Sequence, residues 1–151
     1  MSNTISITTV KESKVDTLDF DTIALGRTFT DHMFVCDYKD GQWENPRITP
    51  MEVIPMHPAC MALHYGQALF EGMKATLGTT GAPLLFRPEK NAERLNFSAR
   101  RLGMPEFSET LFVDALKQLV HLDQKWIPSQ EGSALYLRPF MFADEAFIGM
   151  R

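Results

Sequence analysis

Two apolar repeats of helical period, each with its own start and stop signals, lie between residues 88 and 122. The first starts at Pro88, because proline is favoured at the first position of a helix, and ends at Gly103, a common terminator. Its apolar residues recur three and four positions apart: Ala92, Leu95, Ala99 and Leu102. The second starts after Ser108, whose hydroxyl suits an N-cap, and closes before Pro128. Its apolar positions share one helical face: Phe112, Ala115, Leu116, Leu119 and Val120. The pattern predicts two amphipathic helices.

A hairpin signal precedes the helices. Residues 32–38 are rich in β-branched and aromatic side chains, and Asp40-Gly41 follows them. An Asp-Gly pair between two such runs favours a tight two-residue turn. The returning strand is expected over residues 42–49, where Pro46 indicates a sheet edge or a bulge.

Further strands are expected along the chain both before and after the two helices. A short helical turn is expected over residues 63–70, and strands over 70–77 and 84–87, joined by a turn rich in glycine and proline. After the helices, residues 133–142 alternate and are rich in aromatic side chains, which predicts a last strand. This order predicts an α+β domain with a mostly antiparallel sheet and two main helices.

Charge and hydropathy exclude several function classes. The formal net charge is −4 and the pI is about 5.5, without a run of Lys or Arg, so we expect no nucleic-acid partner and no anionic membrane surface. No stretch approaches the roughly 20 apolar residues of a membrane span, and no secretory signal is apparent, so we expect a cytoplasmic protein. The polar residues 1–20 are expected to form a loosely tied arm, and the domain to cover residues 21–151.

Several catalytic motifs are missing. The sequence contains no Gly-x-Gly-x-x-Gly, no P-loop, no His-Glu-x-x-His and no Gly-x-Ser-x-Gly. The histidines lack metal-ligand spacing with cysteine or carboxylate: His32, His57, His64 and His121. Cys36 and Cys60 do not suggest a disulfide framework and are expected to be half-buried small hydrophobic residues.

Arg94 is the first candidate functional residue, since it lies beside the buried stripe of the first helix. A buried arginine needs an anionic partner, because an unpaired charge there is costly. One alternative is a carboxylate such as Glu93 or Glu71. The other is a phosphate, which the planar guanidinium can bind through two parallel hydrogen bonds.

Tyr136 and Arg138 are the second candidate. Side chains two residues apart on a strand point to the same face, so the pair could bind a carboxylate. The alternative is a surface tyrosine packed on an arginine. From the pattern alone, Tyr65 and Phe70 are interpreted as ordinary core aromatics.

Together these stretches resemble one family. The matching strings are Thr28–Met33, Pro46–Ile48, His57–Ala59, Leu63–Ala75, Leu85–Pro88, Asn91–Leu95 and Leu135–Pro139. In this order and spacing they resemble the small, N-terminal domain of branched-chain amino-acid aminotransferases, which are pyridoxal-phosphate enzymes of fold type IV. The family reaction transfers the amino group of leucine, isoleucine or valine to 2-oxoglutarate, with the cofactor as electron sink.

The resemblance implies roles for individual residues. Arg94 matches the arginine that binds the cofactor phosphate. Tyr65, Phe70 and Tyr136 match residues that line the substrate pocket, and Arg138 with Tyr65 matches the pair that receives the distal carboxylate of glutamate. One pocket then accepts a carboxylate at one end and hydrocarbon along its aromatic wall.

Three more residues are implied at the edge of the pocket. Leu25 stands where relatives often carry an aromatic wall residue. Ile148 and Met150 match residues that reach into the site of a neighbouring subunit, which implies a homodimer.

The family's catalytic lysine has no counterpart among the lysines of this sequence, and Lys74 is expected to be a strand residue. A large, lysine-bearing domain is therefore expected outside this chain, and the fragment alone is expected to be inactive. Two alternatives stay open: another fold type IV enzyme, such as a D-amino-acid aminotransferase or an aminodeoxychorismate lyase, and a free-standing, non-catalytic binding domain.

Overall fold

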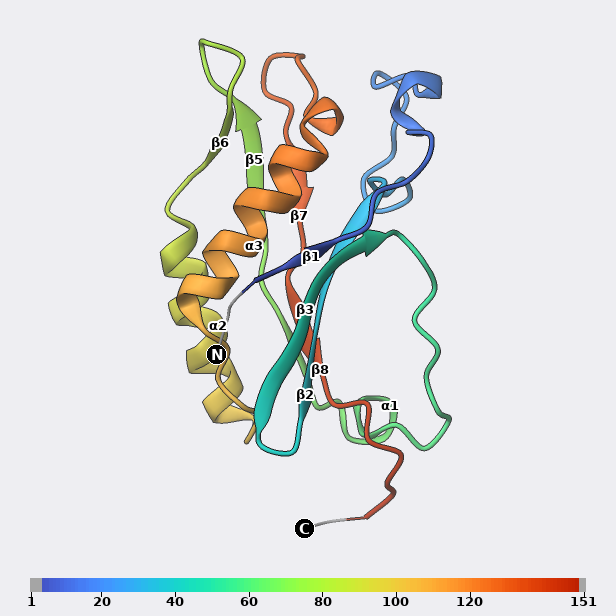
Figure 1. The fold of residues 1–151 in the computed structure, drawn as a ribbon, viewed down its shortest axis with the longest axis vertical. Coiled ribbons are helices and arrows are strands. Elements are labelled where there is room, and N and C mark those ends of the chain that lie inside the picture. Colours follow the sequence, from blue (N-terminus) through green and yellow to red (C-terminus); the bar gives the residue numbers. More distant parts are fainter. Residues whose placement is uncertain (1–3, 150–151) are drawn as a thin grey trace.

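The computed structural model describes residues 4–149, in which three small sheets are combined with two long helices (Figure 1). The strands are β1 (Ser6–Ile7), β2 (His32–Lys39), β3 (Gln42–Pro50), β4 (Ala68–Phe70), β5 (Met73–Leu77), β6 (Pro83–Leu85), β7 (Leu135–Leu137) and β8 (Phe140–Phe142). The helices are α1 (Met61–Tyr65), α2 (Pro88–Arg101) and α3 (Glu109–Leu122), with 3₁₀ turns η1 (Val15–Thr17) and η2 (Gln124–Trp126). The sheets have the strand orders β1-β3-β2, β4-β8 and β6-β5-β7, and only β1 pairs in parallel. The predicted α+β class with mostly antiparallel pairing is confirmed.

The predicted hairpin is present. Strands β2 and β3 pair up to Lys39 opposite Gln42, and the two turn residues Asp40 and Gly41 have φ values of 50° and 83°. Positive φ at both central positions is what a type I′ hairpin turn requires. The bulge expected at Pro46 is also present, because the pairing register shifts where β3 passes through Asn45 and Pro46.

Two strands that the sequence predicts as continuous are each broken, and that prediction is wrong. Residues 70–77 divide into β4 and β5 around Glu71-Gly72, and residues 133–142 divide into β7 and β8 around Arg138-Pro139. The breaks face each other, because β4 pairs with β8 and β5 with β7. Proline has no N–H to donate to a ladder, so pairing stops there and the chain passes from one sheet to the next.

Two other boundaries differ from expectation. The helical turn expected over 63–70 is α1, which ends at Tyr65 because Gly66 takes a left-handed φ of 63°. The strand expected over 84–87 is β6, and it ends early because Arg87 has a φ of 49° and leads directly into α2 at Pro88.

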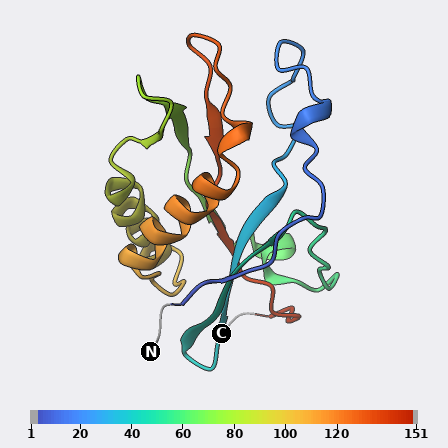
Figure 2. The ribbon, with the colours of Figure 1, turned by 45° about the horizontal axis from the view of Figure 1, so that its top comes forward.

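Helices α2 and α3 form as predicted. Ser108 caps α3 by accepting a hydrogen bond from the Leu111 N–H at 3.2 Å. The two helices lie side by side along the β5–β6–β7 region (Figures 1 and 2). Their inner faces share one core with the buried sides of the strands, although Leu102, predicted in the buried stripe, is 41% exposed.

The N-terminal segment is attached more closely than the loosely tied arm that we expected. Strand β1 pairs with β3, and Ile5 is buried. The buried carboxylate of Asp31 accepts hydrogen bonds from the Ser13 hydroxyl (2.5 Å), the Lys14 N–H (3.1 Å) and the Trp126 indole (2.8 Å). Asp31 therefore ties the segment before β2 to the turn that follows α3.

None of the helices between residues 4 and 149 has the length and apolar character to span a lipid bilayer.

Candidate functional site

An arginine and two aromatic rings meet on the exposed side of the strands. The guanidinium of Arg138 lies 4.1 Å from the ring centroid of Phe70 and 5.2 Å from that of Tyr136. It also donates to the Tyr136 hydroxyl, from Nη2 at 2.9 Å and from Nε at 3.2 Å. Phe70 is 62% exposed and Tyr136 is 37% exposed, so the cluster is open to solvent.

Strand pairing sets the position of the cluster. Phe70 ends β4, and Tyr136 lies on β7 opposite Lys74 of β5. Leu69 and Met73 face the core, while Phe70 and Lys74 face outward, as expected for alternating side chains of an extended chain.

Gly72 lies in the break between β4 and β5 and is exposed, but the Tyr136 side chain approaches it closely. A Cβ atom at this position would stand 2.5 Å from the Tyr136 hydroxyl oxygen, too close for any larger residue without movement of the ring. The lack of a side chain at Gly72 therefore leaves room for the hydroxyl end of the Tyr136 ring.

The buried carboxylate of Glu71, the residue before Gly72, holds the side chain of Arg94. Its Nε donates to Glu71 Oε1 at 2.8 Å and its Nη2 to Glu71 Oε2 at 2.6 Å, and Asn91 Nδ2 adds a bond to Oε2 at 2.8 Å. The Glu71 side chain is 3% exposed and that of Arg94 is 64% exposed. The carboxylate partner considered from the sequence is thus present, and it occupies only one edge of the guanidinium.

The charges of this pair stabilise each other. Burial by itself raises the pKa of Glu71, but the hydrogen bonds from Arg94 and Asn91 and the arginine charge outweigh burial, so this pKa lies below its usual value. The pKa of Arg94 is raised, because it donates hydrogen bonds to Glu71 and lies beside its negative charge. Both groups are ionised at neutral pH.

The contacts that form the cluster involve Arg138, Phe70 and Tyr136, and none of the other predicted site residues. Tyr65 ends α1, is 47% exposed, and its ring is 6.4 Å from that of His64. Leu25 is 83% exposed in the segment before β2, and Ile148 is 62% exposed after β8. These two segments lie at opposite ends of the molecule in both views (Figures 1 and 2). Met150 lies outside the described residues.

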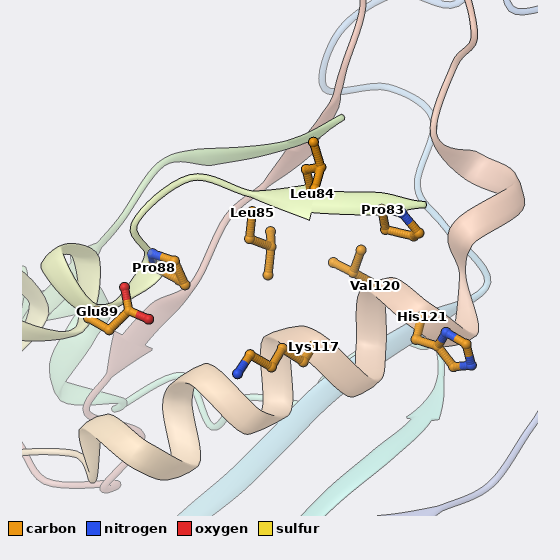
Figure 3. Close-up of a pocket in the computed structure, with 8 residues that line it drawn as sticks. All are labelled: Pro83, Leu84, Leu85, Pro88, Glu89, Lys117, Val120 and His121. Atoms are coloured by element: carbon orange, nitrogen blue, oxygen red, sulfur yellow. The ribbon is translucent and has the colours of Figure 1, made fainter. Parts of the chain in front are cut away.

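Two cavities of about 360 Å³ are present in the described part of the chain, and neither includes a predicted site residue. The first lies between β6 and α3, with Leu85 and Val120 pointing toward each other across it (Figure 3). The second follows the outer face of β5, from Lys74 along the loop over residues 128–134. Lys74 pairs with Tyr136, so the second cavity adjoins the arginine–aromatic cluster. We place the candidate site at the cluster because the chemistry for a carboxylate and a hydrocarbon is found there.

Sequence reasoning missed two residues of this region, Asn91 and Gly72. Asn91 lies three positions before Arg94, so both side chains share one face of α2, and this spacing could have indicated a joint partner. Gly72 gave no signal beyond being a glycine inside an expected strand, a position that often marks a close approach. Between residues 4 and 149, no cluster of three His, Cys, Asp or Glu side chains could hold a metal ion.

Comparison with curated proteins shows clear relatives. The chain is 48% identical to branched-chain-amino-acid aminotransferase 2 of Bacillus subtilis over 97% of its own length and 40% of that protein. It is 46% identical to the branched-chain-amino-acid aminotransferase of Mycolicibacterium smegmatis over 83% of its own length and 35% of that protein. The chain is a homologue of the branched-chain amino-acid aminotransferases. The resemblance inferred from the sequence strings is thereby confirmed over this part of the relatives' length, although no family model matched the chain.

Solved structures of these aminotransferases share the fold. The Escherichia coli enzyme superposes with a TM-score of 0.56 at 23% identity, covering 73% of this chain and 33% of that enzyme. The T.th. enzyme, in complex with N-(5′-phosphopyridoxyl)-L-glutamate, superposes with a TM-score of 0.52 at 27% identity, covering 63% of this chain and 30% of that enzyme. The chain spans about 40% of the length of the curated aminotransferases that it matches.

Proposed function

We propose that residues 21–151 form the small, substrate-side domain of a branched-chain amino-acid aminotransferase. The whole enzyme would transfer the amino group of leucine, isoleucine or valine to 2-oxoglutarate through pyridoxal phosphate. The lysine that carries the cofactor is proposed to lie outside this chain, so that the chain alone is inactive. A homodimer remains a prediction from the resemblance, and a cytoplasmic location remains a prediction from the sequence pattern.

The contact of Arg138 with Phe70 and Tyr136 supports this proposal most directly. The guanidinium can receive a carboxylate through donors that Tyr136 does not occupy, and the aromatic rings offer apolar surface to a branched hydrocarbon side chain. A single site with both features suits a pair of substrates of which one is dicarboxylic and the other apolar.

The residues at Arg94 suit the phosphate of the cofactor. The Arg94 side chain is largely exposed, and the guanidinium edge that Glu71 does not occupy can donate two parallel hydrogen bonds to a phosphate. When bound, pyridoxal phosphate would supply the electron sink for transamination. The side chains of this chain would bind and orient the cofactor and substrate around it.

The test measures substrate preference in the whole enzyme with Arg138→Met. Loss of a charge-assisted contact should raise KM for 2-oxoglutarate by about tenfold or more, and change KM for L-leucine by only about twofold. The matched control is Arg101→Met, since Arg101 is exposed at the end of α2. Equal effects of Arg138→Met on both substrates, or faster turnover of D-alanine than of L-leucine by the unaltered enzyme, would contradict the proposal.

A further inference from the structure

Glu71 is unusual for a carboxylate, because it is almost fully buried while its arginine partner is largely exposed. Leu69 and Met73, two positions before and after it, belong to the hydrophobic core. Its backbone N–H donates to the Pro139 carbonyl at 2.7 Å, which fixes the main chain across the strand break. A buried carboxylate in an otherwise apolar environment is costly unless every oxygen is bonded, and here both oxygens are.

The geometry of the pair determines which part of Arg94 remains available. Glu71 accepts from Nε and from one side of Nη2, so it occupies one edge of the planar guanidinium. The neighbouring edge, formed by Nη1 and the second N–H of Nη2, is not occupied by Glu71 and lies at about 120° to the occupied edge, because the guanidinium is planar and trigonal. That edge has the parallel donors that bind two oxygens of a phosphate.

We propose that Glu71, held by Asn91, is a positioning residue that fixes the guanidinium of Arg94 so that its unoccupied edge is presented to a phosphate monoester. The inference rests on the proposed role of Arg94 in binding the cofactor phosphate, and it adds the residues that prepare that arginine for binding. Asn91 and Arg94 lie on one face of α2, so the helix and the strand break hold the carboxylate from two directions.

Two opposing effects decide whether Glu71 helps an anion to bind. Its negative charge weakens the attraction of Arg94 for phosphate. Its hydrogen bonds remove the rotational freedom of a long, exposed side chain, which otherwise has to be ordered on binding at a cost of about two- to tenfold in affinity. Because the anion would bind a different edge of the guanidinium from the carboxylate, and water around the exposed arginine screens the repulsion between the two anions, we expect the ordering effect to prevail.

The test uses NMR of the Arg94 side chain in the 151-residue protein labelled with ¹⁵N-arginine. The probes are inorganic phosphate and pyridoxine 5′-phosphate, which carries the same phosphate monoester as the cofactor without an aldehyde that reacts with lysines. Unaltered protein is compared with Glu71→Gln, Asn91→Ala and Arg94→Lys. The matched control is Glu106→Gln, which removes the carboxylate from Arg100, another arginine of α2.

We expect the Nε–H signal of Arg94 to exchange slowly with water without any probe, and to move on titration with either phosphate. In Glu71→Gln the signal should exchange rapidly, and the dissociation constant for pyridoxine phosphate should rise about fivefold. Asn91→Ala should weaken binding less, and it provides the test if Glu71→Gln does not fold. Glu106→Gln should bind like the unaltered protein.

The outcomes separate the two proposals. If Glu71→Gln and Asn91→Ala bind pyridoxine phosphate as tightly as the unaltered protein while Arg94→Lys binds poorly, Arg94 is a phosphate ligand but the positioning role is wrong. If the Arg94 signal of the unaltered protein does not respond to either probe, the proposed phosphate site itself is wrong. If inorganic phosphate moves signals of other arginines equally, an adventitious ion only is bound, and the proposed site is equally wrong.

Discussion

Asp31 provides the sharpest test of how the N-terminal segment is attached. The residue is 3% exposed, and its carboxylate accepts three hydrogen bonds: two on Oδ2, from the Ser13 hydroxyl and the Trp126 indole, and one on Oδ1, from the Lys14 N–H. The substitution Asp31→Asn keeps the shape of the side chain and replaces one accepting oxygen by an NH₂ group, which only donates.

The expected loss of stability follows from these contacts. The amide is expected to keep its oxygen at the position that serves Ser13 and Trp126, which leaves its NH₂ group against the Lys14 N–H. One unpaired N–H costs about 1–3 kcal/mol, and two bonds lose the charge that strengthens them, at about 1 kcal/mol each. Relief of the buried charge offsets part of this, so we expect a loss of about 3 kcal/mol in the free energy of unfolding.

Urea unfolding followed by far-UV circular dichroism measures the effect, with Asp16→Asn as control. Asp16 is exposed in η1, so its substitution should change stability by less than about 0.5 kcal/mol. Hydrogen exchange should also show faster exchange around Ser13 and Lys14 in Asp31→Asn. A loss below about 1 kcal/mol, with exchange unchanged, would refute the idea that Asp31 anchors the segment.

The stability difference between the unaltered protein and Asp31→Asn should become smaller as the pH falls. Burial raises the pKa of Asp31, but its hydrogen bonds, with Ser13 first, and the nearby His32 lower it below the ordinary value of 3.8. A carboxyl group with a lowered pKa in the folded state stabilises the fold above its unfolded pKa and loses this contribution as the pH falls through the folded value. The difference between the unaltered protein and Asp31→Asn should therefore be constant near neutral pH and shrink below about pH 4.

Three further predictions concern single positions. Gly72→Ala should displace the Tyr136 ring and remove its hydrogen bond from the neighbouring arginine, seen as a changed tyrosine ring signal by NMR, while the fold is retained. Ser108→Ala should lower the free energy of unfolding by about 1 kcal/mol, because the Leu111 N–H loses its cap; an unchanged urea midpoint would contradict this. Cys36 should react slowly with iodoacetamide at pH 8, because burial, assisted by a neighbouring carboxylate, raises its pKa to about 11; mass spectrometry should show the rate increasing toward that pH.

The elements that the sequence predicted well are those with local signals. Pro88 and Ser108 mark helix starts through their own backbone and side-chain chemistry, and Asp40-Gly41 adopts the positive φ values that its turn requires. The break between β7 and β8 has a local signal in Pro139 that the strand prediction did not use, whereas the break between β4 and β5 depends on partners far along the chain. Glu71-Gly72 interrupts one strand opposite Pro139, and alternation continues through the break, so the periodic pattern carries no sign of it.

The contacts of the candidate site also differ in whether the sequence could predict them. The closeness of Tyr136 to Arg138 follows from a spacing of two residues, and the structure bears it out although Arg138 lies just beyond the end of β7. The approach of Phe70 to this pair depends on β4 meeting β8 and could not be derived from spacing. The family resemblance named Phe70, Tyr136 and Arg138, but only the strand pairing explains why the three side chains are in contact.

The segment Phe70–Gly72 links the two charged parts of the candidate site. Phe70 contacts Arg138 on the exposed side, Glu71 binds Arg94 on the buried side, and Gly72 admits the Tyr136 ring. Because these contacts come from three consecutive residues, a shift of the backbone that repositions one arginine also moves the partner of the other. A shift away from the core, for example from a larger side chain at the buried Met73, should therefore disturb the proposed phosphate and carboxylate binding together, whereas Arg138→Met should affect the carboxylate alone. Separate titrations of the two ligands with both variants would distinguish a linked segment from two independent sites.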